Sequence, residues 1–359
     1  MRAALSLPGL AASLPAHAQV SPEQGTLEFK NVEYADYQPH ERRMRLSSPM
    51  VYWYLPVKDV FAVEGAAATE TLSGASPLFH NTLSGASGLR IHEHRRAADI
   101  KLTAFLRRAS FGVQAATSTE NDFESSATTI ESRISSEDNN TTLALAVSSQ
   151  SDAVGATGFP LLHEARSTRS YLVGVTRVLT PLSIVQSNLT YSAGTGYFSD
   201  PYKLLDNRPR SRDQFAWLAR YNRYFPQSKS ALHLDYRYYR DNWSVQAHTV
   251  DLKYYYPLGG GWTVRPRLRY YTQSAAFFYS NAFPPEFPGQ PYSADQRLAS
   301  FGAVSLGVKL VKALENDFSI DLKAERYEQR ATWRLSGSNG SPLQPFYAYS
   351  VSVGVSKKF

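Results

Sequence analysis

The sequence contains no cysteine among its 359 residues. This absence excludes a disulfide-stabilised scaffold, catalysis by a thiol, and metal sites built from thiolates. The chain also lacks any uninterrupted apolar stretch of about 18 residues, the length that a membrane-spanning helix needs. An ordinary helical membrane protein is therefore excluded.

Aromatic residues are abundant, with 23 Tyr, 18 Phe and 5 Trp, although the mean hydropathy is mildly polar. A chain of this length could form two soluble domains or one large barrel. A polar average with many aromatic residues is typical of a membrane β-barrel, whose strands alternate lipid-facing and lumen-facing residues between aromatic girdles. A soluble array of β-sandwiches is the competing interpretation.

The N-terminus has the pattern of a secretory signal peptide. Residues 1–18 carry one charge at Arg2, an apolar run over Ala3–Leu14, and an A-x-A cleavage site at Ala16–Ala18. We therefore expect a cleaved signal peptide at 1–18 and a barrel domain over 19–359.

The final residues, YAYSVSVGVSKKF, alternate with the period of a β-strand. One face is small and polar, and the other is apolar except for Lys357, whose long stem can carry its amine to lipid headgroups. The pattern resembles the C-terminal strand by which bacterial outer-membrane barrels are recognised for insertion by the barrel-assembly machinery. The expected insertion signal consists of Tyr347, Tyr349, Val351, Val353, Val355 and Phe359.

Three consecutive segments, 230–240, 244–256 and 262–274, alternate apolar and polar residues over 10 to 12 positions. This length suits a tilted transmembrane strand. The same pattern elsewhere predicts an antiparallel up-and-down β-barrel of about sixteen strands. The predicted ranges are 27–37, 44–55, 58–66, 94–106, 109–119, 126–136, 140–150, 168–179, 182–193, 213–224, 230–240, 244–256, 262–274, 298–310, 317–329 and 346–359.

The links between these segments alternate in length. Every second link is short, for example Arg107–Arg108 and Thr180–Pro181. The opposite set is mostly long, with intermediate links after the first and fifth strands and a tight turn at Asp241–Trp243. Short periplasmic turns and long extracellular loops are typical of outer-membrane barrels, so we expect both termini in the periplasm.

Several blocks of sequence resemble a family of uncharacterised bacterial outer-membrane proteins, domain of unknown function 3570. The blocks are the repeated TLSGAS of residues 71–76 and 82–87, SSED at 135–138, GYFSDPYK at 196–203, YRYYRDNW at 236–243 and RYYTQSAAFFY at 269–279. The resemblance implies a barrel in the outer membrane. It implies no catalytic residue, and only hints at a redox or assembly role in the envelope.

The predicted inner wall is the main candidate for a functional site. Opposite charges on neighbouring strands can pair directly, because the strands lie about 4.8 Å apart. One interpretation is a ladder of ion pairs filling a polar interior, which is the commoner arrangement; the other is a constriction whose excess of arginine attracts anions. The candidate residues are Asp235, Arg237, Asp251, Lys253, Arg265, Arg267 and Arg269, with Asp321, Lys323 and Glu325 on an opposing wall.

Signals for a metal site or an enzyme are weak. His92 and His94 would share a strand face but lack a third ligand, so we expect no metal and no cofactor. Ser244 and His248 would lie about 13 Å apart on one strand, too far for a direct hydrogen bond. In the loops, 196–203 predicts an ordered turn held by aromatic packing, and Pro284–Tyr292 a semi-rigid Pro-rich segment.

These features favour a porin-like channel or binder for small polar solutes, with anions as one candidate class, in contact with outer-membrane lipid. An alternative is a non-conducting envelope component that serves assembly, export or redox-linked processes with periplasmic or lipoprotein partners. A second alternative is an outer-membrane lipid hydrolase, although we expect no enzyme. The net charge of +7 is not taken as a sign of nucleic-acid binding.

Overall fold

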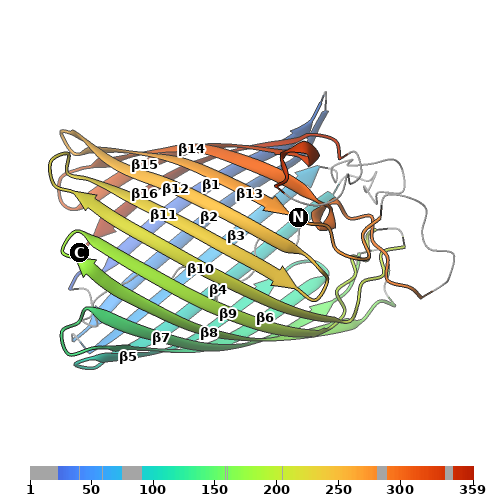
Figure 1. Cartoon of the computed structure of the whole chain (residues 1–359), viewed down its shortest axis with the longest axis horizontal. Helices are drawn as coiled ribbons and strands as arrows, with labels where there is room; N and C mark the ends of the chain where they lie inside the picture. Colours follow the sequence, from blue (N-terminus) through green and yellow to red (C-terminus); the bar gives the residue numbers. More distant parts are fainter. Residues whose placement is uncertain are drawn as a thin grey trace.

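The computed structural model describes residues 23–359 except 40, 59, 75–90, 158, 160, 204, 281–288 and 336–342. Sixteen antiparallel strands form a closed barrel, in which each strand pairs with its sequence neighbours and β16 returns to β1 (Figure 1). The strands are β1 (Thr26–Gln38), β2 (Glu41–Val57), β3 (Phe61–Gly74), β4 (Ile91–Phe105), β5 (Ala109–Thr119), β6 (Phe123–Ser135), β7 (Thr141–Val154), β8 (Glu164–Thr180), β9 (Ser183–Gly196), β10 (Ser211–Phe225), β11 (Ser230–Asp241), β12 (Gln246–Gly259), β13 (Trp262–Gln273), β14 (Phe301–Ala313), β15 (Phe318–Arg330) and β16 (Phe346–Lys358).

The predicted all-β barrel of sixteen strands is confirmed. Most strands begin or end within a few residues of the prediction, and β5 matches it at both ends. The largest difference is β3, which continues to Gly74 although the alternation was expected to end at Ala66. The reason is local: Ala66, Ala67 and Ala68 put small side chains on both faces, so the apolar-polar pattern disappears while the backbone stays extended.

The two ends of the barrel differ in the length of their connections. At one end, shown on the left of Figure 1 with the C-terminus, every described turn is short. The other end carries the longer connections 155–163, 197–210, 274–300 and 331–345. The expectation of intermediate links after β1 and β5 is wrong. The strands that follow them, β2 and β6, begin three residues earlier than predicted, so the links shrink to 39–40 and 120–122.

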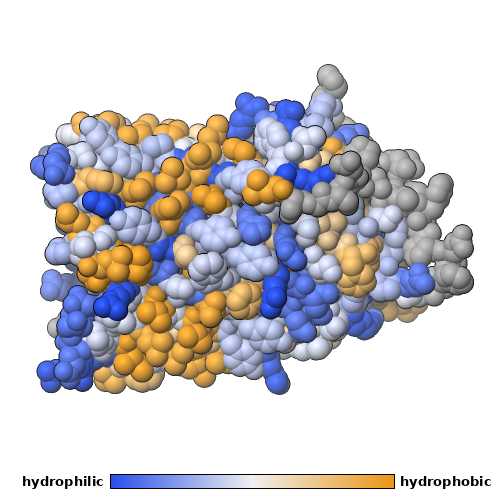
Figure 2. All heavy atoms as spheres, viewed as in Figure 1, coloured by the Kyte–Doolittle hydropathy of each residue, from blue (hydrophilic) through white to orange (hydrophobic). Residues whose placement is uncertain are grey.

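Side chains alternate strictly between an apolar outer face and a polar inner face. On β7, Leu143, Leu145 and Val147 are exposed on the outside, while Ala144 and Ser148 are buried on the inside. Apolar residues gather on the outer wall toward the short-turn end (Figure 2). Among the described residues, no helix is long and apolar enough to cross a membrane. A surface apolar outside and polar inside, with no strand edge, is what a membrane barrel needs.

The seam between β16 and β1 closes the barrel. Pairs run from Thr26 opposite Lys358 to Tyr37 opposite Tyr347, and the backbones of Gly25 and Phe359 exchange two further hydrogen bonds. Lys357, the charged residue on the apolar face, bends to the rim, where its amine donates to the carbonyl of Asn316.

The small inner face of β16 makes room for charged side chains of its neighbours. A Cβ on Gly354 would lie 2.6 Å from a carboxylate oxygen of Asp321 and 3.2 Å from the Cε atom of Lys30. The space that the glycine leaves is therefore occupied, and the Asp321 carboxylate lies 3.0 Å from the amine of Lys309.

We predict that Gly354→Ala lowers the free energy of unfolding by about 1–2 kcal/mol, because the added methyl group displaces the Asp321 carboxylate from Lys309. Gly155→Ala, in the loop after β7, is the control, since its Cβ would meet its nearest neighbour at 3.4 Å, an ordinary contact distance. Urea unfolding followed by tryptophan fluorescence measures both variants. Equal stability of the two would contradict the close approach at Gly354.

Candidate functional site

The predicted charged residues of β11, β12, β13 and β15 all lie on the inner wall of the barrel. Their outward neighbours, such as Leu234, Val250 and Leu268, are 37%, 40% and 46% exposed on the opposite face. The register places Asp235 opposite Asp251, and Asp251 opposite Arg269. The structure thus brings the candidates of β11, β12 and β13 together on one surface. The expectation that Asp321, Lys323 and Glu325 lie on an opposing wall is wrong, because β15 is separated from β13 only by β14.

Arg267 is the centre of this surface. Its guanidinium contacts Asp251, with Nη2 2.5 Å from Oδ2, and reaches over β14 to Glu325, with Nη1 2.9 Å from Oε2. Gly307 is the residue of β14 in register with both Arg267 and Glu325. Because that position has no side chain, an arginine on β13 can pair with a carboxylate two strands away.

Two residues that the sequence interpretation did not single out extend the network on either side. Arg220 of β10 donates to both carboxylate oxygens of Asp235, at 2.7 and 3.0 Å. Lys309 of β14 pairs with Asp321. Both lie at inward positions of strands whose ranges were predicted, so the alternation alone could have identified them. The resulting charged ladder consists of Arg220, Asp235, Lys253, Asp251, Arg267, Lys309, Asp321, Lys323 and Glu325.

The ladder is not a dry core. Its charged side chains keep between 12% and 34% of their surface exposed toward the interior, with Lys323 and Lys253 at the upper end. Charged groups that retain part of their surface avoid the full cost of desolvation. The pairs therefore line a space that water can enter.

Three arginines on the same wall stand outside the ladder. Among the described residues, no carboxylate lies within 4.0 Å of the guanidinium groups of Arg237, Arg265 or Arg269. Arg265 instead lies over the ring of Tyr255, at 4.8 Å from its centroid. Asp251 is directly opposite Arg269 on the neighbouring strand, but its carboxylate forms an ion pair with Arg267 instead. The wall consequently has an excess of positive charge.

The long-loop end of the barrel holds a buried ionic cluster that joins two loops. Asp295, whose side chain is fully buried, accepts hydrogen bonds from Arg297 of its own loop and from Arg208 of the β9–β10 loop, with Arg208 Nη2 at 2.8 Å. Arg297 also pairs with Asp200 at 3.1 Å. Burial by itself would raise the pKa of Asp295, but Arg297, Lys203 and Arg208 outweigh it and hold the pKa well below its usual range.

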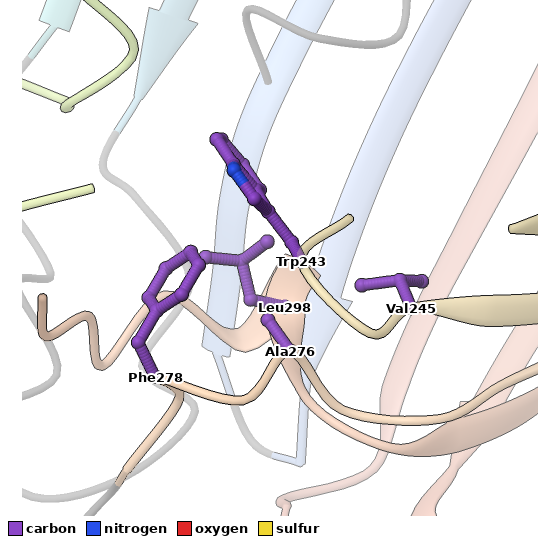
Figure 3. Packing of buried hydrophobic residues seen from close by; sticks show 5 residues of the cluster. All are labelled: Trp243, Val245, Ala276, Phe278 and Leu298. Carbon is purple, nitrogen blue, oxygen red and sulfur yellow. The ribbon is translucent and has the colours of Figure 1, made fainter. Parts of the chain in front are cut away.

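A buried cluster at the same end of the barrel consists of Trp243, Val245, Ala276, Phe278 and Leu298 (Figure 3). Trp243, in the turn between β11 and β12, is 1% exposed and packs against Phe278 and Leu298 of the β13–β14 loop. Its indole nitrogen donates to the carbonyl of Ser211 at 2.9 Å, and the guanidinium of Arg212 lies 4.1 Å from the ring centroid. Three connections are therefore fixed to one another at this end.

Part of the loop structure covers the inner wall itself. Tyr279 and Leu343, from two different loops, pack with inward-facing Tyr271 and Tyr327 around the buried Phe301. Loop residues thus occupy the inner side of the wall near this mouth, on the strands β13 to β16. No periodic pattern in the sequence indicates this packing, because it depends on contacts between irregular segments.

The loop predictions have mixed outcomes. Phe198 of the 196–203 segment packs edge-on against Trp243, and Tyr202 donates to Asp122 of the β5–β6 turn, so this segment is ordered by aromatic side chains as predicted. Of Pro284–Tyr292, residues 284–288 lie outside the described part of the chain. Tyr292 is buried and forms a β-bridge with Asn207.

The weaker candidates do not form a site in the described part of the chain. Ser244 lies in the turn before β12 with a φ of 68°, so placing it on that strand was wrong. His248 faces outward, and its Nδ1 lies 2.8 Å from the hydroxyl of Tyr236. His94 contacts Thr71, and the side chain of His92 is not described. No group of three or more His, Asp or Glu residues gathers as a metal site among the residues with described positions.

Comparison with known proteins places the chain in a family. The family described as "Protein of unknown function (DUF3570)" matches residues 81–349, so the chain belongs to it. No curated protein sequence matches the chain.

Two solved structures share the fold. CdiB from Acinetobacter baumannii has a TM-score of 0.53 at 10% identity, over 91% of this chain and 60% of that one. This chain therefore spans less than two thirds of the CdiB structure. A bacterial polysaccharide outer membrane secretin has a TM-score of 0.52 at 9% identity, over 93% of this chain and 98% of that one. The fold is that of an outer-membrane β-barrel.

We predict that Asp295→Asn detaches the β13–β14 loop, because it leaves two guanidinium groups without their buried carboxylate. Breaking such a pair costs about 3–5 kcal/mol, which corresponds to a protease susceptibility of the loop raised by roughly a hundredfold to several thousandfold. Limited proteolysis with mass mapping of the fragments measures it. Asp138→Asn in the short β6–β7 turn is the control and should leave this loop protected.

The same cluster predicts a pH dependence. A carboxylate whose pKa is depressed on folding contributes stability above its unfolded pKa of about 4 and loses it as the pH falls toward the folded value. Protection of the β13–β14 loop should therefore stay constant from pH 8 to pH 5 and decline only below about pH 4. A decline that begins between pH 7 and pH 5 would contradict the assignment to Asp295.

Proposed function

We propose that the protein is a water-filled outer-membrane channel for small polar solutes, with a preference for anions. The observation that carries this proposal is the inner wall of β11 and β13. There, no carboxylate of the described residues lies within 4.0 Å of the Arg237, Arg265 or Arg269 guanidinium group, while the surrounding ladder is paired. Fixed positive charge on a pore wall raises the local concentration of anions.

The width of the barrel supports the same proposal. A barrel of sixteen strands is wide enough for an aqueous channel, whereas the side chains of an eight-stranded barrel fill its interior. All sixteen strands belong to the wall, and the 3₁₀ turns Gln296–Leu298 and Ala331–Trp333 lie beyond strand ends. The apolar outer face is suited to lipid, and the short turns and C-terminus would face the periplasm.

The packed mouth favours a second candidate, a non-conducting envelope component. Loops fixed by Trp243 and Asp295 over the inner face of β13 to β16 could narrow the entrance beyond the passage of solutes. The barrel would then act through partner proteins in assembly or export. Purification from native membranes followed by conductance measurement separates the two candidates. A channel would conduct ions as the purified protein alone, whereas the envelope component would show no conductance and would purify with a partner protein.

We predict that the double variant Arg237→Gln, Arg269→Gln loses most of its anion preference but keeps its conductance. A unit charge at about 7 Å in water contributes about 0.6 kcal/mol, or roughly a threefold change in local ion concentration. The reversal potential in a planar bilayer under a salt gradient measures it.

Arg177→Gln, which removes the same charge from the outer face of β8, is the control and should leave the reversal potential unchanged. Absence of channels, or an ion preference unaltered in the double variant, would overturn the proposal.

A further inference from the structure

A polar patch interrupts the apolar outer wall at the seam of the barrel. It consists of Asn31 and Glu33 on β1 and Ser47 on β2. The Glu33 carboxylate accepts hydrogen bonds from Asn31 Nδ2 at 2.9 Å and from Ser47 Oγ at 2.7 Å. All three side chains point outward, since the adjacent Asp36 and Ser48 are buried on the inner face.

The register fixes the depth of this patch. Asn31 is opposite Val353 and Glu33 is opposite Val351, two residues of β16 that are 50% and 45% exposed on the outer face. Farther toward the long loops, Tyr37 stacks on Tyr347 and Tyr349, as in the aromatic girdle that marks the membrane interface. The patch therefore lies on the lipid side of that girdle.

A carboxylate at this depth costs free energy when only lipid surrounds it. Polar groups on the lipid face of a barrel cost free energy, and no water is present to replace their hydrogen bonds. Within the described residues, no lysine or arginine lies within 4.0 Å of Glu33. Arg45 of β2, opposite Ala35 on the same outer face, forms no ion pair with Glu33, so among the described residues this carboxylate has no ion-pair partner.

A suitable counter-charge lies on the other side of β16. Arg326 of β15 faces outward opposite Tyr349, one outward position above the level of Glu33. Its side chain is 53% exposed, and its ion-pair partner Glu328, at 3.5 Å, is shared with the closer Arg330 at 2.5 Å. Arg326 is therefore available for another carboxylate.

Twofold symmetry brings the two groups together. An axis along the membrane normal, passing over β16, keeps depth constant and exchanges left with right. The β1 edge of one barrel then faces the β15 edge of the other, so Glu33 meets Arg326 twice across one interface. Val351 and Val353 lie on the axis, flanked by Ala35 and Ala324, whose small side chains allow close approach.

We propose that the protein forms a twofold homodimer through the outer faces of β15, β16 and β1, with Glu33 of each copy paired to Arg326 of the other. Charge complementarity between Glu33 and Arg326, which lies one outward position nearer the long loops, selects a second copy as the occupant. A lipid headgroup cannot supply the cation below the aromatic girdle. The proposal is independent of whether the barrel conducts.

The absence of cysteine makes a direct test clean. Val353→Cys places a single thiol beside the proposed axis, and mild oxidation of native membranes should give a disulfide-linked dimer. Val147→Cys is the matched control, because Val147 is 52% exposed on the outer face of β7, far around the barrel. We expect at least tenfold more cross-linked dimer from Val353→Cys. Equal cross-linking, or none at Val353, would overturn the proposal.

Charge exchange tests the ion pair. In the Val353→Cys background, Glu33→Lys or Arg326→Glu alone should reduce cross-linking about tenfold, and the two together should restore it. Glu124→Lys, an equal charge change on the outer face of β6, should have no effect. Heat-modifiable gel mobility shows whether the double-exchange variant is a folded barrel. If this variant is folded but cross-linking is not restored, the Glu33–Arg326 pair is refuted. A trimer by mass in detergent would likewise exclude the twofold arrangement.

Discussion

The structure depends on the closure of the sheet between β1 and β16. A bilayer offers no water to an unpaired backbone group, so every N–H and C=O along the wall must find a partner within the protein. The register from Thr26–Lys358 to Tyr37–Tyr347 supplies those partners at the last open edge. Once the sheet is closed, the period of two sorts each side chain to the outer or inner face, and the polar residues gather inside.

The polar inner face brings many charged side chains close together, and the charged ladder pairs them with opposite charges. Ion pairs between neighbouring strands, such as Arg220 with Asp235, satisfy charges that would otherwise face each other across a space of reduced polarity. Glycines at positions 307 and 354 provide the room that the longer contacts need. The irregular loops meet the same requirement at the mouth, where Asp295 neutralises two arginines in a fully buried position.

The sequence was sufficient for the parts of the structure that are periodic. Alternation located sixteen strands and the inward parity of the charged residues, and it failed in β3, where three alanines remove the contrast between faces. The same alternation could also have identified Arg220 and Lys309 as charged residues of the inner wall, since each occupies an inward position. The contacts of Trp243 and Asp295 were not, because they join loops far apart in sequence through geometry that has no period.

Competition for a single carboxylate decides which of two arginines on β13 stays unpaired. Asp251 stands directly opposite Arg269, but Arg267 contacts it with two nitrogens and is held in place by Glu325 from the far side of Gly307. A bidentate pair of this kind is stronger than a single contact, so Asp251 stays with Arg267 and Arg269 is left over. Replacing Gly307 by a bulky residue would cut the bridge to Glu325 and free Arg267 to move. The glycine therefore governs which arginine remains unpaired, and through it the charge that a solute in the lumen would meet.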